Sequence, residues 1–193
     1  MKIRFLIAIF ILALTYSTNA QSDSLNKKET IGNFTYYEPI FIHHKPNKPN
    51  IIYQRFEEIS VIALDSVFKG KKYKINEKYN LSLTNEVKNE LIPFFNTGKK
   101  NKEIIEFTPN IKLVSETTND HYGLFLLIKT KSSLSIGTAP ISKIQLEIIV
   151  MDFSLNKVIF HEKSKNLSPS NNGGYAFTLI KNLDYIYKEM RKQ

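Results

Sequence analysis

The sequence predicts a two-layer α+β domain, in which a mixed or antiparallel sheet of about five strands is covered by two helices. Residues 122–131 give the strongest strand signal, because five consecutive apolar residues lie at their centre. Residues 143–152 alternate apolar and polar side chains and form a predicted hairpin with residues 158–164. Residues 175–190 carry one continuous apolar stripe at helical spacing, which predicts a helix packed on the sheet.

Earlier elements of the domain give weaker signals. Residues 59–65 are β-branched and apolar on both faces, which predicts a buried central strand, and a weaker strand is expected at residues 71–75. Thr84 can cap the helix that follows it, and Pro93 should kink this helix or end it. Residues 111–115 predict a further strand, so that strands outnumber helices.

The N-terminus has the layout of a secretory signal peptide. Two basic residues precede an unbroken apolar run at residues 5–14, and Thr18 and Ala20 supply a small-residue cleavage site. The alternative is an uncleaved anchor, but a membrane-spanning helix needs about 20 apolar residues. We therefore expect residues 1–20 to be removed after Ala20, leaving a secreted or periplasmic chain that does not span a membrane.

Residues 21–50 are predicted to be a flexible N-terminal arm and linker, followed by a single domain over residues 51–193. Residues 32–42 are rich in aromatic side chains and are expected to form either an edge strand or an arm lying on the domain, and Pro39 argues against a central strand there. The FIHHKPNKPN stretch that begins at Phe41 has two prolines, which predict a stiff spacer. The expected contact surface for a partner is either an exposed sheet edge, by strand addition, or this arm, by aromatic docking. The side chains of the arm that could bind a partner are its aromatic residues, Phe34, Tyr36, Tyr37 and Phe41.

Composition excludes several classes of function. The chain has no cysteine, so it can form neither disulfides nor cysteine-based zinc or iron–sulfur sites, and thiol catalysis is excluded. Its formal net charge is +9, but only three of the 27 basic residues are arginine, the side chain that reads phosphates and bases with a planar fork. We therefore expect no nucleic-acid partner.

Candidate catalytic and metal-binding residues are scattered along the sequence. His43 and His44 are adjacent, so their side chains alternate in an extended chain, and metal capture by the four histidines is only a minor hypothesis. The Glu57–Glu58 pair and Asp120 are candidate carboxylates, yet no nucleophile elbow or phosphate-binding loop accompanies them. The sequence therefore predicts no metal, no cofactor and no catalytic residues.

A hydrolase acting on an envelope polymer or a small molecule is the alternative function. It predicts a concave pocket in which carboxylates or histidines converge, with Asp120, His121 and His161 as the residues to follow. The oligomeric state is not predicted.

Three short segments carry a resemblance to a known group of proteins. They are the Asn-Asp-His-Tyr-Gly-Leu step at residues 119–124, the strand end at residues 149–152 and the turn and return at residues 156–159. With the order of elements over residues 59–190, they resemble the N-terminal domain of TolB and the curli-secretion lipoproteins. The resemblance implies an exported, non-enzymatic accessory protein that binds a protein or envelope partner, although the lipid-anchor cysteine common in that group is absent.

Overall fold

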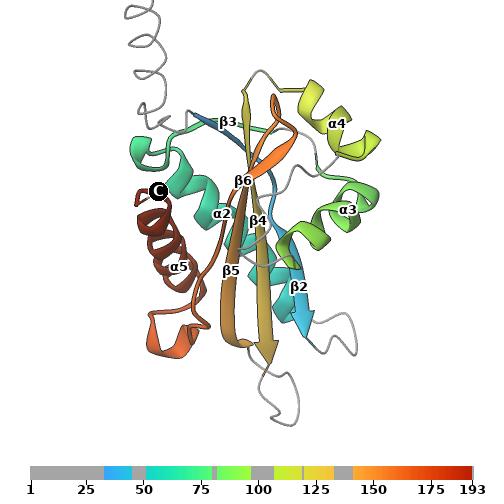
Figure 1. The fold of residues 1–193 in the computed structure, drawn as a ribbon. Coiled ribbons are helices and arrows are strands. Elements are labelled where there is room, and N and C mark those ends of the chain that lie inside the picture. The colour runs from blue at the N-terminus through green and yellow to red at the C-terminus, as the bar shows by residue number, and fades with distance from the viewer. Residues whose placement is uncertain are drawn as a thin grey trace, which may run out of the picture. The chain divides into compact units, whose positions relative to one another are not determined.

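The computed structural model describes residues 33–44, 51–79, 82–96, 107–118, 120–132 and 141–192, which form an α+β domain on one mixed sheet (Figure 1). Its strands are β1 (Phe34–Tyr36), β2 (Ile40–His44), β3 (Ile75–Lys78), β4 (Tyr122–Ser132), β5 (Ile141–Asp152) and β6 (Lys157–Lys163). Its α-helices are α2 (Ile51–Phe68), α3 (Asn85–Asn96), α4 (Pro109–Glu116) and α5 (Tyr175–Met190), and short 3-10 helices lie at Lys71–Tyr73 and Pro169–Asn171. The predicted α+β class is confirmed.

The sheet combines parallel and antiparallel pairs. β4, β5 and β6 form an antiparallel meander, with β4 and β5 paired along nearly their whole length. On the other side of β4, β1 and β2 both run parallel to it, one after the other, and β3 pairs with β1. β1 and β2 therefore act as one interrupted strand beside β4.

An extra residue interrupts this strand between β1 and β2. Tyr36 pairs with Leu124 and Ile40 pairs with Leu127, so four steps along one strand oppose three steps along the other. A bulge of this kind exchanges the two faces of the strand that follows it. Tyr36 and Phe41 are five residues apart and would lie on opposite faces of a regular strand. Because of the bulge they lie on the same face, and both contact phenylalanines of α2.

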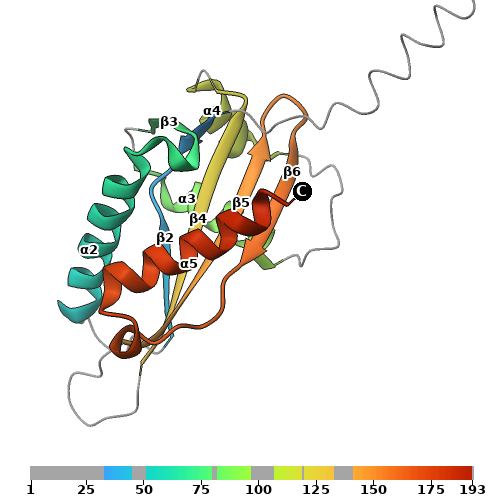
Figure 2. The ribbon, with the colours of Figure 1, turned by 90° about the vertical axis from the view of Figure 1, so that its left-hand side faces the viewer.

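Helices cover both faces of the sheet, so the expected arrangement of two layers and two helices is wrong in this respect. α2 and α5 pack against each other on one face, and α3 and α4 lie on the other (Figures 1 and 2). The physical reason is visible in β4, where residues 123–128 are all buried. A strand that is apolar on both sides needs cover on both sides.

The face under α3 and α4 has an apolar core drawn from the helices and from alternate strand positions. Its fully buried members include Tyr37, Leu91, Ile111, Leu127, Ile149 and Met151. On the opposite face, α2 and α5 bury the remaining strand positions, among them Leu126, Ile128, Ile144, Leu146 and Val150. The sheet is thus the middle of three layers.

The strand predicted at residues 59–65 is wrong, because these residues lie inside α2. The buried positions of α2 recur every three or four residues over 18 residues: Tyr53, Phe56, Ser60, Leu64 and Phe68. A window of seven residues shows only the apolar run, whereas the whole segment shows the helical period.

The strand predicted at residues 111–115 is also wrong, because α4 occupies this segment. Thr108 caps the helix by accepting a hydrogen bond from the backbone N–H of Ile111 at 3.3 Å, and Pro109 stands at the first helical position. A threonine followed by proline is a helix-start signal, since proline has no N–H to leave unpaired there. Here the cap outweighs strand propensity.

Other predicted elements are confirmed. The strand over residues 122–131, the hairpin of β5 and β6 and the helix over residues 175–190 all form. Thr84 accepts a hydrogen bond from the Val87 N–H at 3.3 Å at the start of α3. This helix continues past Pro93, so of the two expected outcomes, a kink or an end, the end is wrong. The weak strand expected at residues 71–75 begins only at Ile75.

The predicted domain boundary at residue 51 is wrong for part of the arm, because β1 and β2 belong to the sheet. Pro39 lies in the interruption between them, where a missing N–H costs no ladder bond. Residues 45–50 and 21–32 lie outside the described part of the chain. Among the helices that are described, none has the length and apolar character to cross a bilayer.

Candidate functional site

The aromatic residues predicted to bind a partner are mostly part of the core, which corrects that prediction. Phe34, Tyr36 and Tyr37 are each at most 1% exposed, and Tyr37 stacks on Phe125 with ring centroids 4.3 Å apart. Their large apolar surface stabilises the sheet instead of remaining available for docking. Phe41 alone stays partly exposed, and it lines a groove at the edge of the sheet.

That groove follows an open edge. β2 pairs with β4 on one side, and no strand among the described residues pairs with its other side. Such an edge presents backbone N–H and C=O groups that an added strand can use. The strand itself reads Ile-Phe-Ile-His-His and carries no lysine or carboxylate.

The edge groove has a volume of about 780 Å³. Its lining residues are Glu38 and Pro39 before β2; Ile40 and Phe41 of β2; Gln54, Glu57, Glu58, Val61 and Ile62 of α2; and Lys88 of α3. Three carboxylates therefore face one ammonium group. Ile62 is 68% exposed, so the groove also offers apolar contact area. An acidic wall beside an open strand edge suits an extended, basic chain segment.

His43 fixes the position of β2 on α2. Its Nδ1 and Nε2 lie 2.7 Å from Thr130 Oγ1 and Glu57 Oε1, and its ring stacks on Tyr53 with centroids 4.2 Å apart. These contacts hold the Glu57 carboxylate at the groove and occupy both ring nitrogens. His44 is exposed, so the predicted alternation of the two histidines is confirmed.

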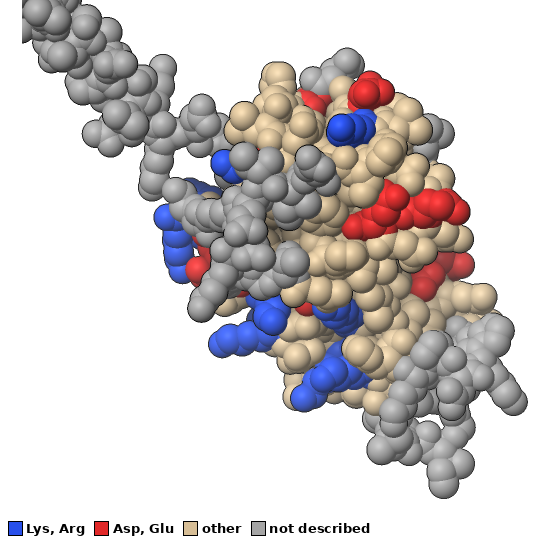
Figure 3. All heavy atoms as spheres, turned by 45° about the vertical axis from the view of Figure 1, so that its right-hand side comes forward, with Lys and Arg blue, Asp and Glu red and all other residues tan. Residues whose placement is uncertain are grey.

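Charges are unevenly distributed on the molecular face that Figure 3 shows. The larger acidic groups lie on the right-hand side and at the top of this view, where a basic side chain is adjacent, whereas most lysine and arginine side chains lie to the left and below. The chain as a whole has a net charge of +9. A local acidic region on a basic protein creates a field that orients an approaching cation or basic peptide.

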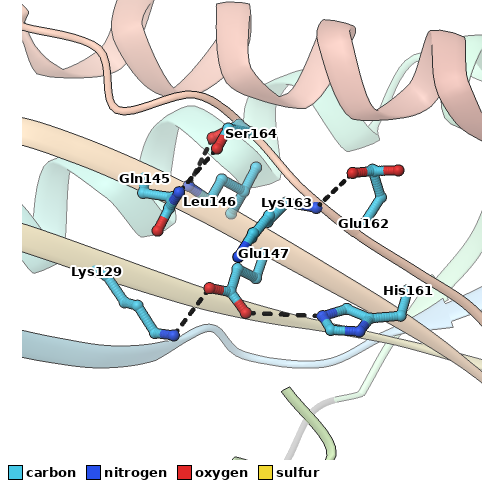
Figure 4. Close-up of polar contacts among 8 residues, drawn as sticks. All are labelled: Lys129, Gln145, Leu146, Glu147, His161, Glu162, Lys163 and Ser164. Atoms are coloured by element: carbon cyan, nitrogen blue, oxygen red, sulfur yellow. Dashed lines mark hydrogen bonds and ion pairs between the residues drawn. The ribbon is translucent and has the colours of Figure 1, made fainter. Parts of the chain in front are cut away.

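A second polar cluster is buried under the α3 side of the sheet (Figure 4). Lys129 Nζ lies 2.8 Å from Glu147 Oε1, and His161 Nε2 lies 3.7 Å from Glu147 Oε2. The second distance is an ion-pair contact, too long for a hydrogen bond. The Glu147 side chain is only 4% exposed, so this carboxylate depends on its two neighbours for stabilisation.

Two opposing effects set the pKa of Glu147. Burial alone raises the pKa, but the attraction of His161 and Lys129 outweighs burial and lowers the pKa below its ordinary value of 4.5. Alternation along β5 correctly predicts that Glu147 faces away from Ile148, but the sequence does not reveal that α3 covers this second face. Because the three residues come from three adjacent strands, the cluster ties β4, β5 and β6 together.

The residues that a hydrolase would bring together do not converge. Asp120 accepts hydrogen bonds from Thr35 at 2.8 Å and from Asn76 at 3.0 Å, and His121 is exposed. By strand register, His161 stands two strands from Phe125, so Asp120 lies about 16 Å away along the strand direction at about 3.3 Å per residue. Within the described ranges, no group of three or more histidine and carboxylate side chains could hold a metal ion.

Fold and site together define a class: an α+β domain whose mixed sheet has one open, acidic edge. No protein-family model and no curated protein sequence matches the chain. Among solved structures it is similar to the hypothetical protein CT253 from Chlamydia trachomatis, with 12% sequence identity, a TM-score of 0.41, and coverage of 83% of this chain and 94% of that chain. This likeness assigns neither a family nor a function, and the resemblance to TolB and curli-secretion proteins stays a prediction.

Proposed function

We propose that this chain is an exported, non-enzymatic accessory protein of the cell envelope, and that it binds a polypeptide partner by strand addition at β2. One observation carries the proposal: the unpaired side of β2 faces a groove with an acidic wall. In strand addition, main-chain hydrogen bonds supply affinity and pockets for alternate side chains supply specificity. The partner segment is therefore extended, with basic side chains at alternate positions.

Charge supports a foreign partner over a second copy of this chain. Two copies joined edge to edge through β2 would place Glu57 and Glu58 of both chains around one groove. Like charges held opposite each other destabilise such a pairing. A lysine- or arginine-rich segment has the opposite effect, and its association should weaken as salt screens the attraction.

Export is the second part of the proposal, and the layout of residues 1–20 supports it. When the full-length gene is expressed in a bacterium, the protein recovered from the periplasm or medium should begin at Gln21, as intact-mass spectrometry can show. A protein that keeps residues 1–20 and stays with the membrane fraction would favour the uncleaved anchor instead.

The binding proposal can be tested with a defined probe, the acetylated octapeptide KVKVKVKV carrying a fluorophore. Its anisotropy titration should give saturable binding that weakens with salt. Replacing Glu57 and Glu58 together by glutamine should raise the Kd about threefold to tenfold, the equivalent of about 1 kcal/mol of lost charge interaction. The amide introduced in place of the Glu57 carboxylate would keep an oxygen for His43, so β2 should stay in place.

Two controls separate the groove from general charge effects. Glu189→Gln removes a carboxylate near the end of α5, where it pairs with Lys192 at 2.7 Å, and should leave the Kd unchanged. The octapeptide EVEVEVEV should bind far more weakly than its lysine counterpart. Equal binding of both peptides, or an unchanged Kd in the double glutamine variant, would contradict the proposal.

A further inference from the structure

A second, smaller cavity lies between α2, β1 and β3, and it shares no lining residue with the edge groove. Its volume is about 230 Å³, and its walls are formed by Tyr36, Asp65, Phe68, Lys69, Ile75, Asn76, Glu77 and Lys78. The aromatic rings of Tyr36 and Phe68 pack edge to face, with centroids 4.5 Å apart, and give the cavity an apolar wall. Apart from Ile75, the remaining lining residues are polar or charged.

Two polar atoms of this cavity are buried without a hydrogen-bond partner among the described residues. They are the Tyr36 hydroxyl, on a residue that is 1% exposed, and Asp65 Oδ1, a buried atom on a side chain that is 29% exposed. A buried polar atom left unpaired costs about 1–3 kcal/mol, so native proteins pair such atoms with protein, water or ligand. Two such atoms on one cavity offer a bound molecule one donor and one acceptor.

The chemistry of the two atoms defines what can complete them. Burial first, and then the negative charges of Asp65 and Glu38, raise the pKa of Tyr36 far above its ordinary value, so its hydroxyl stays protonated and can donate. Asp65 Oδ2 already accepts from Lys78 Nζ at 2.6 Å, which leaves Oδ1 as an acceptor. A group that both accepts and donates, such as an alcohol, satisfies the two atoms together.

The charge of the lining decides between ligand classes. Asp65 and Glu77 are balanced by Lys69 and Lys78, so the cavity has no net preference for an anion or a cation. Small-molecule sites combine apolar walls with a few placed polar groups, and this cavity is smaller than the roughly 300–1,000 Å³ of sites for drug-sized ligands, which limits its occupant to a small molecule. We propose that it binds a neutral polyhydroxylated molecule of monosaccharide size, with one hydroxyl bridging Tyr36 and Asp65 and a ring face against Tyr36 and Phe68.

The protein also contains a matched control for this site. Tyr37 is fully buried and its hydroxyl has no partner in the described structure, but Tyr37 does not line the cavity. Tyr36→Phe and Tyr37→Phe each remove one unpaired hydroxyl and keep the ring. Because neither change opens a hole or breaks a bond, both variants should fold.

The test is an NMR titration of the isotope-labelled protein with glucose and with N-acetylglucosamine, followed at the amides of residues 75–78. Both neutral sugars should shift these amides saturably, glucosamine and glucuronate should bind more weakly, and Tyr36→Phe should raise the Kd about threefold to tenfold. Tyr37→Phe should leave the Kd unchanged. The proposal is overturned if neither neutral sugar gives a saturable shift, if a charged sugar binds best, or if Tyr36→Phe and Tyr37→Phe behave alike.

Discussion

Among the described strands, β2 and β6 each pair on only one side. They differ in the features that discourage another strand from pairing with the free side. β6 reads Lys-Val-Ile-Phe-His-Glu-Lys, with a lysine at each end, and its pairing with β5 is irregular between Val150 and Met151. β2 has no lysine and no irregularity within its pairing to β4. Lysines, bulges and prolines are the devices by which natural sheets discourage strand addition. β6 has such features within the strand, whereas those next to β2, the bulge and Pro39, lie before its first residue.

The open edge of β2 is therefore a local property and does not follow from its being an edge strand. β3, the other edge strand, is four residues long and three of its residues are exposed, so it too is a poor template. The same sheet thus protects two edges and leaves one open beside acidic side chains. Substitutions near β2 and near β6 can test this difference between the edges, and their expected effects range from large to small.

The largest effect is expected from removing the support of β2. Phe56 is fully buried in α2 and contacts Phe41, His43 and Tyr175. Phe56→Ala should lower the free energy of unfolding by about 3–4 kcal/mol, because it leaves a cavity in a packed core. Urea denaturation measures the loss, and amide hydrogen exchange should rise more in β2 than in β6.

Phe160→Ala is the matched control on the side of β6, where Phe160 is 2% exposed. It should cost a similar amount but raise exchange mainly in β6. If both variants loosen the two strands equally, the edges are not independent and the contrast fails.

The next effect concerns the charged cluster that ties β6 to β4. Glu147→Gln should lower the free energy of unfolding by about 2 kcal/mol at pH 7, because Lys129 and His161 lose their shared carboxylate. The folded-state pKa of Glu147 is below 4.5, so its contribution is complete above pH 4.5 and is lost as pH falls through the folded pKa. Denaturation midpoints at pH 7 and at pH 3 measure the change.

The expected sign is that wild type and Glu147→Gln differ at pH 7 and converge at low pH. Glu189→Gln, on the exposed end of α5, should show no such convergence. A difference that persists or grows at low pH would contradict the role assigned to the Glu147 carboxylate.

A smaller effect on stability is expected from replacing His43, and almost none from replacing its neighbour His44. His43→Ala removes contacts to Thr130 and Glu57 and should cost about 1–2 kcal/mol, whereas His44→Ala, at an exposed position, should change stability by less than about 0.5 kcal/mol. Thermal unfolding of the two single variants makes the comparison. Equal effects would mean that His43 does not hold β2 on α2.

The smallest effect on stability is expected when β2 is given a terminal lysine like those at the ends of β6. His44→Lys places a lysine at the end of β2 without altering a buried contact, so stability should change by less than about 0.5 kcal/mol. The Kd for the KVKVKVKV peptide should nevertheless rise about threefold, through repulsion of like charges. Unchanged binding would show that charge at this end of β2 does not control access to the edge.

Sequence reasoning succeeds where one period runs without interruption. β4, the β5–β6 hairpin and α5 each keep a single pattern over seven or more residues, and all were predicted. For residues 32–42 the sequence predicts either an edge strand or an arm and does not decide between them, because the extra residue before Ile40 exchanges the faces and interrupts the alternation. The prediction for residues 59–65 is wrong for a different reason, because the apolar centre of α2 has the composition of a buried strand.

The candidate site depends on those same two segments. An exposed sheet edge is a predicted contact surface, but the sequence does not indicate which strand supplies it. The Glu57–Glu58 pair forms a groove wall only because α2 is a helix lying beside β2. The helical spacing of Gln54, Glu58 and Ile62 was the available signal. The cavity at Tyr36 needs β1, β3 and α2 together, and no local pattern predicts such a meeting.

The most direct test of the open edge uses the absence of cysteine from the chain. His44→Cys at the end of β2 and Lys163→Cys at the end of β6 each place one exposed thiol beside an edge strand. A KVKVKVKV peptide whose added terminal cysteine is activated as its 2-thiopyridyl disulfide should exchange with the β2 variant, releasing 2-thiopyridone, much faster than with the β6 variant. KVKVKVKV peptide without cysteine should suppress this difference. Equal rates for the two variants, or a faster reaction at β6, would contradict the claim that β2 is the edge open to a partner strand.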